Sequence, residues 1–152
     1  MDASTLEKPV EPLDAPAENT FSHVKQGDTQ FESGGLRDFF LYRDLGIAKA
    51  TGGKVLAQLV KANEAPTDGT GWHRHVADFH IVLMLKGWAR FMYEDKVTLV
   101  KTGDCVHQRP GIVHFLFDYS PDMEYLEIAS PADLKTVEMP GPCPVPPPTP
   151  WK

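Results

Sequence analysis

Residues 71–87 read GWHRHVADFHIVLMLKG, and three of the chain's six histidines lie in this stretch. Side chains at positions i and i+2 of a β-strand point to the same face, so His73 and His75 can offer both imidazoles to one ion. His80 follows five residues after His75, far enough for a tight turn and a return on a neighbouring strand. His114 opens a further strand after a Pro-Gly turn. Because imidazole is the commonest metal ligand, we expect these four histidines to converge on a metal site rather than to be unconnected core or surface residues.

Short apolar segments separated by Gly, Pro, Asp or Asn surround this stretch on both sides. No segment has a sustained 3.6-residue apolar period, which argues against long helices. Many short strands at close spacing indicate an antiparallel sandwich or barrel, so the sequence predicts an all-β protein. The strands are expected at roughly 36–43, 54–62, 71–76, 79–86, 88–94, 97–101, 104–109, 113–119 and 123–129.

Both ends of the 152-residue chain differ in composition from the middle. Residues 1–20 hold five acidic residues and one basic residue and have little that could pack, so we expect a flexible acidic tail. Residues 140–152 contain seven of the 14 prolines and predict an extended tail, which could lie on its own domain, in solvent or on a neighbouring subunit. One domain at residues 21–139 is expected between the tails.

Charge and composition exclude several partners and compartments. The formal net charge of −6 and the lack of a basic cluster argue against nucleic-acid binding. No apolar run is long enough for a membrane helix, and the first residues do not read as a secretory signal, so we expect a cytoplasmic protein that binds no membrane. The two cysteines, Cys105 and Cys143, form no metal or redox motif and are expected to be free thiols.

Two histidine-bearing segments resemble the paired motifs of the cupin superfamily. The first motif, G-x5-H-x-H-x3-4-E-x6-G, is matched by His73, His75, His80 at the glutamate place, and Gly87. The second motif, G-x5-P-x-G-x2-H-x3-N, is matched over residues 103–118. In this second match Gly103, Gly111 and His114 keep their places, Arg109 stands at the proline place beside Pro110, and Asp118 stands at the asparagine place. The resemblance therefore covers about residues 71–118.

The resemblance implies a double-stranded β-helix, or jelly-roll barrel, with one divalent metal held by His73, His75, His80 and His114. Replacement of the usual glutamate by His80 leaves the full 2+ charge on the site, which would attract a small anionic substrate. An all-nitrogen ligand set suits Fe, Mn, Ni, Cu or Zn and disfavours Mg and Ca. If His80 turned away from the metal, the site would resemble that of the three-histidine iron dioxygenases of this superfamily.

Strand alternation predicts further residues inside the barrel. Starting from His80 and His114, every second residue should point inward, which selects Val82, Met84, Leu116 and Asp118. The polar candidates for orienting a substrate or accepting a proton are Gln58, Arg90, Tyr125 and Glu127, with Glu127, Tyr125 and Arg90 taken as the catalytic candidates. For Arg90 and Glu127 the alternative is a solvated or cross-strand ion pair. His107 and His23 are expected outside the metal site.

Three functions are compatible with these residues. The first is a metal-dependent, oxygenase-type enzyme that acts on a small chelating organic anion. The second is a non-redox isomerase, lyase or cyclase in which Glu127 or Tyr125 moves a proton. The third is a metal- or ligand-binding barrel without turnover. Segments that are apolar on both faces, such as 81–85 and 115–117, also predict a homodimer.

Overall fold

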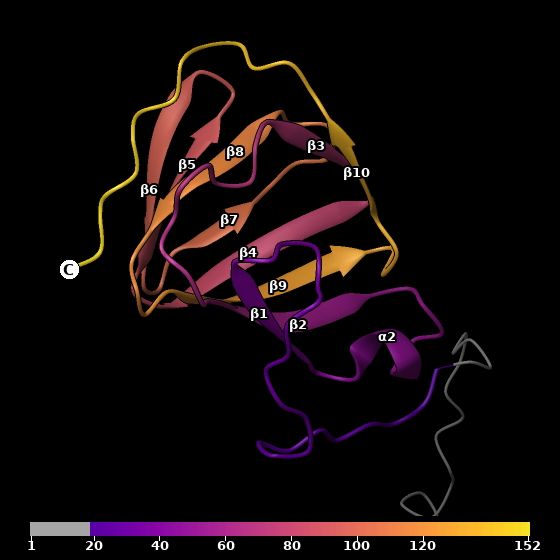
Figure 1. Cartoon of the computed structure of the whole chain (residues 1–152). Helices are drawn as coiled ribbons and strands as arrows, with labels where there is room; N and C mark the ends of the chain where they lie inside the picture. Colours follow the sequence, from indigo (N-terminus) through magenta and orange to yellow (C-terminus); the bar gives the residue numbers. More distant parts are fainter. Residues whose placement is uncertain (1–18) are drawn as a thin grey trace, which may run out of the picture.

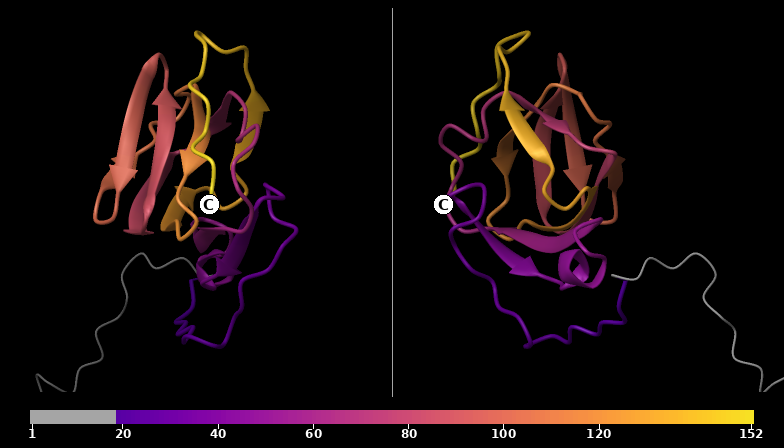
Figure 2. Two further views of the ribbon diagram at one scale, coloured as in Figure 1. Left: turned by 60° about the vertical axis from the view of Figure 1, so that its left-hand side comes forward. Right: turned by 90° about the vertical axis from the view of Figure 1, so that its right-hand side faces the viewer.

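The computed structural model describes residues 19–152, so the predicted acidic tail lies, except for its last two residues, outside the described part. Two five-stranded antiparallel sheets face each other and enclose the core (Figures 1 and 2). The first sheet has the order β1 (Phe40–Asp44), β2 (Leu56–Ala62), β9 (Glu124–Ser130), β4 (Phe79–Lys86) and β7 (Cys105–His107). The second has the order β10 (Lys135–Glu138), β3 (His73–Val76), β8 (His114–Tyr119), β5 (Trp88–Tyr93) and β6 (Lys96–Lys101). The all-β prediction is confirmed.

Alternation along β4 shows how the sequence builds the interior. His80, Val82 and Met84 are each at most 3% exposed, while the residues between them are only partly buried. The buried residues of both sheets meet in one apolar core that includes Val82, Phe91 and Leu116. The core fills the space between the sheets next to the histidines, so the histidine side chains are directed into an apolar interior.

Two short elements and one strand boundary differ from the prediction. The helix α2 (Ile47–Ala50) is a single turn and β10 is four residues long, so neither is long enough to produce a visible apolar period. The strand predicted at 36–43 begins only at Phe40. A turn precedes it, in which the Phe40 N–H donates to the Arg37 carbonyl at 3.3 Å. This turn moves Arg37 out of the sheet.

Alternation also fails at Asp118, which was predicted to point into the barrel. The pairing of β8 with β5 shifts by one residue, because Phe91 lies opposite Leu116 whereas Arg90 lies opposite Asp118. Such a bulge reverses the face on which the following side chains lie. Asp118 is fully buried but pairs with Arg90 at 2.8 Å instead of lining the interior.

The proline-rich tail lies against its own barrel (Figure 1, yellow). The Thr149 backbone N–H and hydroxyl donate to the Asp118 carboxylate at 2.9 and 2.8 Å. The Trp151 indole N–H donates to the Tyr119 carbonyl at 3.1 Å, and its ring packs on the core. The tail thus covers Asp118 and shields the Arg90–Asp118 pair.

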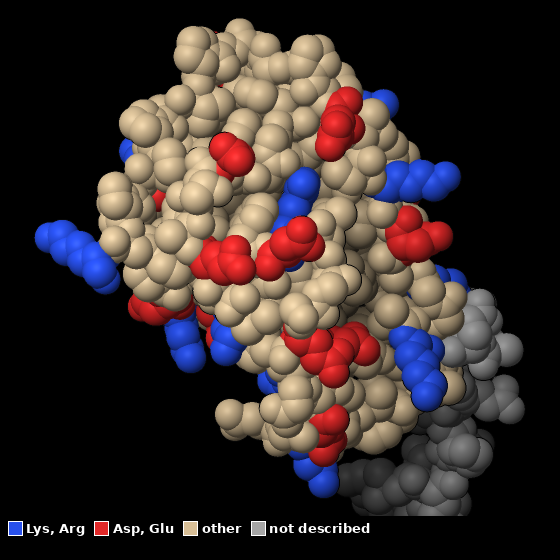
Figure 3. All heavy atoms as spheres, viewed as in Figure 1, with Lys and Arg blue, Asp and Glu red and all other residues tan. Residues whose placement is uncertain are grey.

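Three further features concern the cysteines, the surface charge and the absence of a long apolar helix in the described residues. Cys105 and Cys143 are both free thiols, as predicted. Acidic and basic side chains are interspersed on the face seen in Figure 3. Among residues 19–152, no helix has the length and apolar character needed to cross a membrane.

Candidate metal centre

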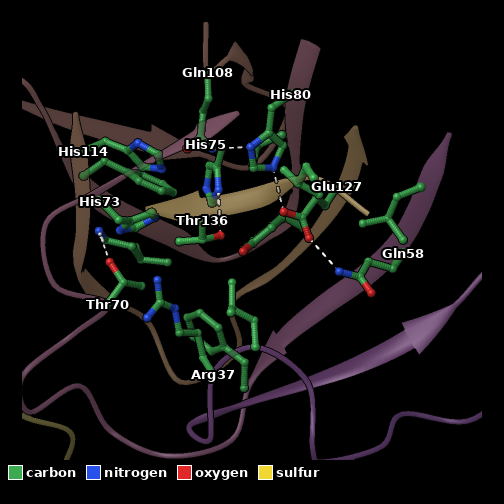
Figure 4. Close-up of a pocket in the computed structure, with 18 of the residues that line it drawn as sticks. Arg37, Gln58, Thr70, His73, His75, His80, Gln108, His114, Glu127 and Thr136 are labelled. Carbon is green, nitrogen blue, oxygen red and sulfur yellow. Dashed lines mark hydrogen bonds and ion pairs between the residues drawn. The ribbon is translucent and has the colours of Figure 1, made fainter. Parts of the chain in front are cut away.

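Three histidines from two neighbouring strands form the centre of the site. His73 and His75 lie on β3, and His114 on β8 lies directly opposite His73 in the sheet. One ring nitrogen of each histidine lies within 4.8 Å of those of the other two. All three side chains are buried, and they face the same interior space (Figure 4). One ion could therefore be reached by all three imidazoles.

Hydrogen bonds hold each of these rings in a defined orientation. The Nδ1 atoms of His73 and His114 lie 2.8 and 2.9 Å from the carbonyl oxygens of Gly71 and Ile112. A carbonyl oxygen only accepts, so Nδ1 carries the hydrogen in both rings and the Nε2 lone pair stays free. The Nδ1 atom of His75 lies 3.0 Å from the Thr136 hydroxyl, which can accept in the same way. This arrangement fits a metal ion bound by three Nε2 atoms.

Burial keeps the three imidazoles neutral. It lowers the pKa of His73 from 6.5 to about 4 and the pKa values of His75 and His114 to about 3. The neighbouring histidines add to this lowering, because each protonated ring disfavours the protonation of the next. At neutral pH the lone pairs are therefore available, and a neutral imidazole is the form that binds a transition metal.

His80 lies in the same cavity but has different partners. Its ring centre is 4.9 Å from that of His75, yet it falls outside the group of three. Its Nε2–H donates to Glu127 Oε1 at 2.6 Å, and its Nδ1 accepts from the Gln108 amide at 3.2 Å. In this arrangement both ring nitrogens are occupied, so His80 has no free lone pair for an ion. A fourth-ligand role for His80 stays a prediction.

The His80–Glu127 pair is held from both sides by amides. The Gln58 amide donates to Glu127 Oε2 at 2.8 Å, and the Tyr93 hydroxyl donates to the Gln108 amide oxygen at 2.6 Å. Burial alone would raise the pKa of Glu127, but the hydrogen bonds from His80 and Gln58 outweigh it and lower that pKa. The Glu127 side chain is 15% exposed. It is thus an oriented carboxylate, ionised at neutral pH, that faces the cavity.

Of the other two catalytic candidates, Tyr125 lies in the cavity and Arg90 lies outside it. Tyr125 lines the cavity, and burial raises its pKa well above 10, so its hydroxyl stays protonated. Arg90 does not line the cavity. It forms the cross-strand ion pair with Asp118 and lies over the ring of Phe117, so the prediction of Arg90 as a substrate-orienting residue is wrong in this structure. His107 and His23 are exposed and lie outside the site.

A different arginine, Arg37, lies in the cavity. Arg37 comes from the turn before β1. The sequence predicted a strand at 36–43, so a place for Arg37 in the cavity was not predicted. The cavity has a volume of about 210 Å³. Its wall combines these polar side chains with apolar ones, which include Leu36, Phe40, Leu56, Phe91, Leu116 and Leu134. The site is sized for a small organic molecule.

Comparisons with known proteins agree with this architecture. Residues 55–125 match the model of the AraC-like ligand binding domain family. Three solved structures with the same fold are the polyketide cyclase RemF from Streptomyces resistomycificus, KdgF from Halomonas sp. and a predicted oxalate decarboxylase from Thermotoga maritima. RemF is 17% identical, with a TM-score of 0.59 over 81% of this chain and 90% of RemF.

The other two structures are similarly distant in sequence. KdgF is 15% identical, with a TM-score of 0.58 over 72% of this chain and 94% of KdgF. The Thermotoga protein is 23% identical, with a TM-score of 0.56 over 72% of this chain and 98% of its own. No curated protein matches the chain by sequence. The facing antiparallel sheets and these structural neighbours together show that the chain has the double-sheeted β-barrel fold of these proteins.

Proposed function

We propose that the protein is a metal-dependent enzyme that moves protons on a small chelating organic anion without redox chemistry, as an isomerase, lyase or cyclase. The observation that carries this proposal is the His80–Glu127 pair, which faces the same cavity as the three-histidine group. An oxygenase, which the sequence favoured, needs a redox metal with open positions. It does not need a carboxylate and an imidazole oriented for proton transfer.

The metal and the protein residues would have separate tasks. When bound by His73, His75 and His114, a transition metal such as Zn, Mn or Ni would polarise a substrate oxygen and thereby acidify the neighbouring C–H or O–H group. Glu127 would accept that proton on its carboxylate and return it to another atom of the substrate. A positioned general base of this kind contributes about 10²–10⁴-fold to the rate.

His80 and Gln58 would support Glu127 in this step. Their two hydrogen bonds fix the direction of the carboxylate, and the His80 N–H stabilises its negative charge before the proton arrives. Gln108 fixes His80 in the tautomer that donates to Glu127, because its amide N–H donates to Nδ1. The apolar side chains in the wall, such as Phe91 and Leu116, would limit the access of water to the reacting atoms.

Related folds support this choice without deciding it. RemF is a polyketide cyclase, so a barrel of this fold serves a reaction of the proposed class in at least one other protein. At 17% identity the likeness shows the fold alone, and one fold hosts many functions. The proposal therefore rests on the residues of this cavity.

A second candidate function is oxygenase chemistry. It is favoured by the three-histidine group, because His73, His75 and His114 could hold an iron ion, which would supply redox chemistry with dioxygen. A barrel that binds metal or ligand without turnover is the third outcome to be distinguished.

One experiment separates these functions. Protein purified without chelator is analysed for metal and incubated in D2O with small keto acids and 1,3-diketones, while proton NMR follows hydrogen exchange next to the carbonyl and an electrode follows oxygen. We expect exchange that requires the metal and Glu127, with no oxygen uptake. Oxygen uptake coupled to loss of the organic compound would favour the oxygenase. Binding with neither reaction would leave only the binding barrel.

A further inference from the structure

We infer that Arg37 binds a carboxylate of the substrate across the cavity from the histidines, so that the substrate is a small acid with a metal-chelating end and a separate carboxylate. This inference rests on the proposed function, because it names the substrate class of the same site. Arg37 lines the cavity together with the three histidines. Figure 4 shows its guanidinium group directed toward them from the opposite side.

Among the described residues, no carboxylate lies within ion-pair distance of the Arg37 guanidinium, and Glu138 attracts it only from farther away. Within residues 19–152, no side-chain hydrogen bond satisfies the guanidinium either. Glu127 is the one acidic residue in the cavity wall, and its two oxygens already accept from His80 and Gln58. Burial lowers the pKa of Arg37, which reflects the cost of removing this cation from water. An anionic ligand would offset that cost.

Hydrogen bonds and a ring contact hold the turn that contains Arg37 in place. The Arg37 N–H donates to the Tyr42 hydroxyl at 3.0 Å. Glu32 and Tyr42 exchange two backbone hydrogen bonds of 2.8 and 2.9 Å, which close the loop on β1. The Tyr42 ring lies against Gly35, where a Cβ would clash with the edge of the ring. Glycine at 35 therefore lets the loop fold over Tyr42 and hold Arg37 at the cavity.

A carboxylate matches both the shape and the charge of this position. The planar fork of a guanidinium donates two parallel hydrogen bonds to the two oxygens of a carboxylate. The three histidines are neutral, so a metal there keeps its 2+ charge, and Glu127 supplies one negative charge. The cavity with metal bound therefore has an excess of positive charge at two separate points. A cavity of about 210 Å³ can hold one small molecule that carries both anionic groups.

A matched pair of acids tests this inference. Malate and 2-hydroxybutyrate share the α-hydroxy acid that can chelate a metal, but only malate has a second carboxylate. The dissociation constants of both are measured by calorimetry with zinc-loaded protein. We expect wild type to bind malate at least about tenfold more tightly, since a charge-assisted hydrogen bond to an arginine contributes a factor of that size or more.

Three variants locate the cause of that preference. Arg37→Gln should abolish it and leave the binding of 2-hydroxybutyrate unchanged, which also shows that the metal end of the site is intact. Gly35→Ala should reduce it in the same direction, because the added methyl displaces the loop without changing Arg37. The control is Arg109→Gln, which removes an equal charge from an exposed arginine paired with Glu94 and should preserve the preference.

The outcomes separate this inference from the proposed function. Equal affinities of wild type for the two acids, or an unchanged preference in Arg37→Gln, would overturn the assignment of Arg37. Hydrogen exchange that still required Glu127 in that case would leave the proposed function standing. A malate preference that is lost in Arg37→Gln, without hydrogen exchange in any variant, would support the carboxylate site and contradict the proposed proton transfer.

Discussion

Replacing Glu127 by Gln is the most informative single change, because it keeps the shape of the side chain and removes the base. Glu127 now accepts from two N–H groups, at 2.6 Å from His80 and at 2.8 Å from Gln58. A glutamine has one acceptor oxygen and one NH2 group, so it can satisfy only one of these donors. We expect the unmatched contact to lower the free energy of unfolding by about 1–3 kcal/mol.

The effect of Glu127→Gln on catalysis should be much larger than its effect on stability. Loss of the carboxylate should slow hydrogen exchange at the substrate carbon by about 10²–10⁴-fold. The metal content should not change, because the rings of His73, His75 and His114 are oriented by Gly71, Thr136 and Ile112 and not by Glu127. The assay is the NMR exchange rate per bound metal, with Glu127→Asp as the variant that keeps a displaced carboxylate.

Two results would refute this reasoning. Exchange by Glu127→Gln within about threefold of wild type, at equal metal content, would show that Glu127 is not the base. A parallel loss of metal and activity would show instead that Glu127 supports the metal site, and the assignment of separate tasks to the two groups would be wrong.

Three further predictions concern stability and assembly. Burial lowers the pKa values of the three histidines from 6.5 to about 4 or about 3. Below pH 6.5 these histidines are therefore protonated in the unfolded metal-free chain but stay neutral in the folded one. The free energy of unfolding of the metal-free protein is therefore greatest above pH 6.5 and should fall toward pH 4 by up to about 4 kcal/mol per pH unit. Urea unfolding midpoints that do not change between pH 7 and pH 5 would contradict this. Removal of residues 148–152 deprives the buried Asp118 of its hydrogen bonds from Thr149, so the free energy of unfolding in urea should fall by roughly 2–4 kcal/mol. An unchanged free energy of unfolding would mean that the tail contact does not stabilise the fold. We also propose a homodimer through the outer face of the first sheet, where Leu59, Leu126 and Leu83 lie side by side in register and are only partly buried. Light scattering should give a dimer at micromolar concentration for wild type and a monomer for Leu83→Glu, and a monomeric wild type would refute the proposal.

The sequence predicted the all-β barrel and the convergence of four histidines, and the structure brings three of them, His73, His75 and His114, within reach of one ion. His73 and His75 share a face because they are two residues apart, and that relation needs no knowledge of the rest of the chain. The partner of His80 could not be predicted in the same way. Glu127 is 47 residues away, and the two meet only because β4 and β9 pair in a register that places Val82 opposite Glu127.

The errors at Asp118 and Arg37 have local physical causes. The bulge between β5 and β8 depends on the pairing of two strands, so simple alternation from His114 could not reveal that Asp118 faces the tail. Residues 36–38 directly precede the apolar run 39–42, so the predicted strand was extended across them. The turn that contains Arg37 is stabilised by the contact of Tyr42 with Gly35, and no sequence pattern predicts this contact. Arg37 was therefore missed and Arg90 was selected in its place.

The metal content of histidine variants tests the central claim most directly. Elemental analysis of protein purified without chelator should give about one transition-metal ion per chain for wild type and for His80→Ala, because three histidines suffice to hold the ion. The double variant His75→Ala, His114→Ala should retain less than about a tenth of the metal, while exposed His23→Ala and His107→Ala should retain all of it. Full metal content in the double variant, or a loss in His80→Ala as large as in the double variant, would contradict the three-histidine centre.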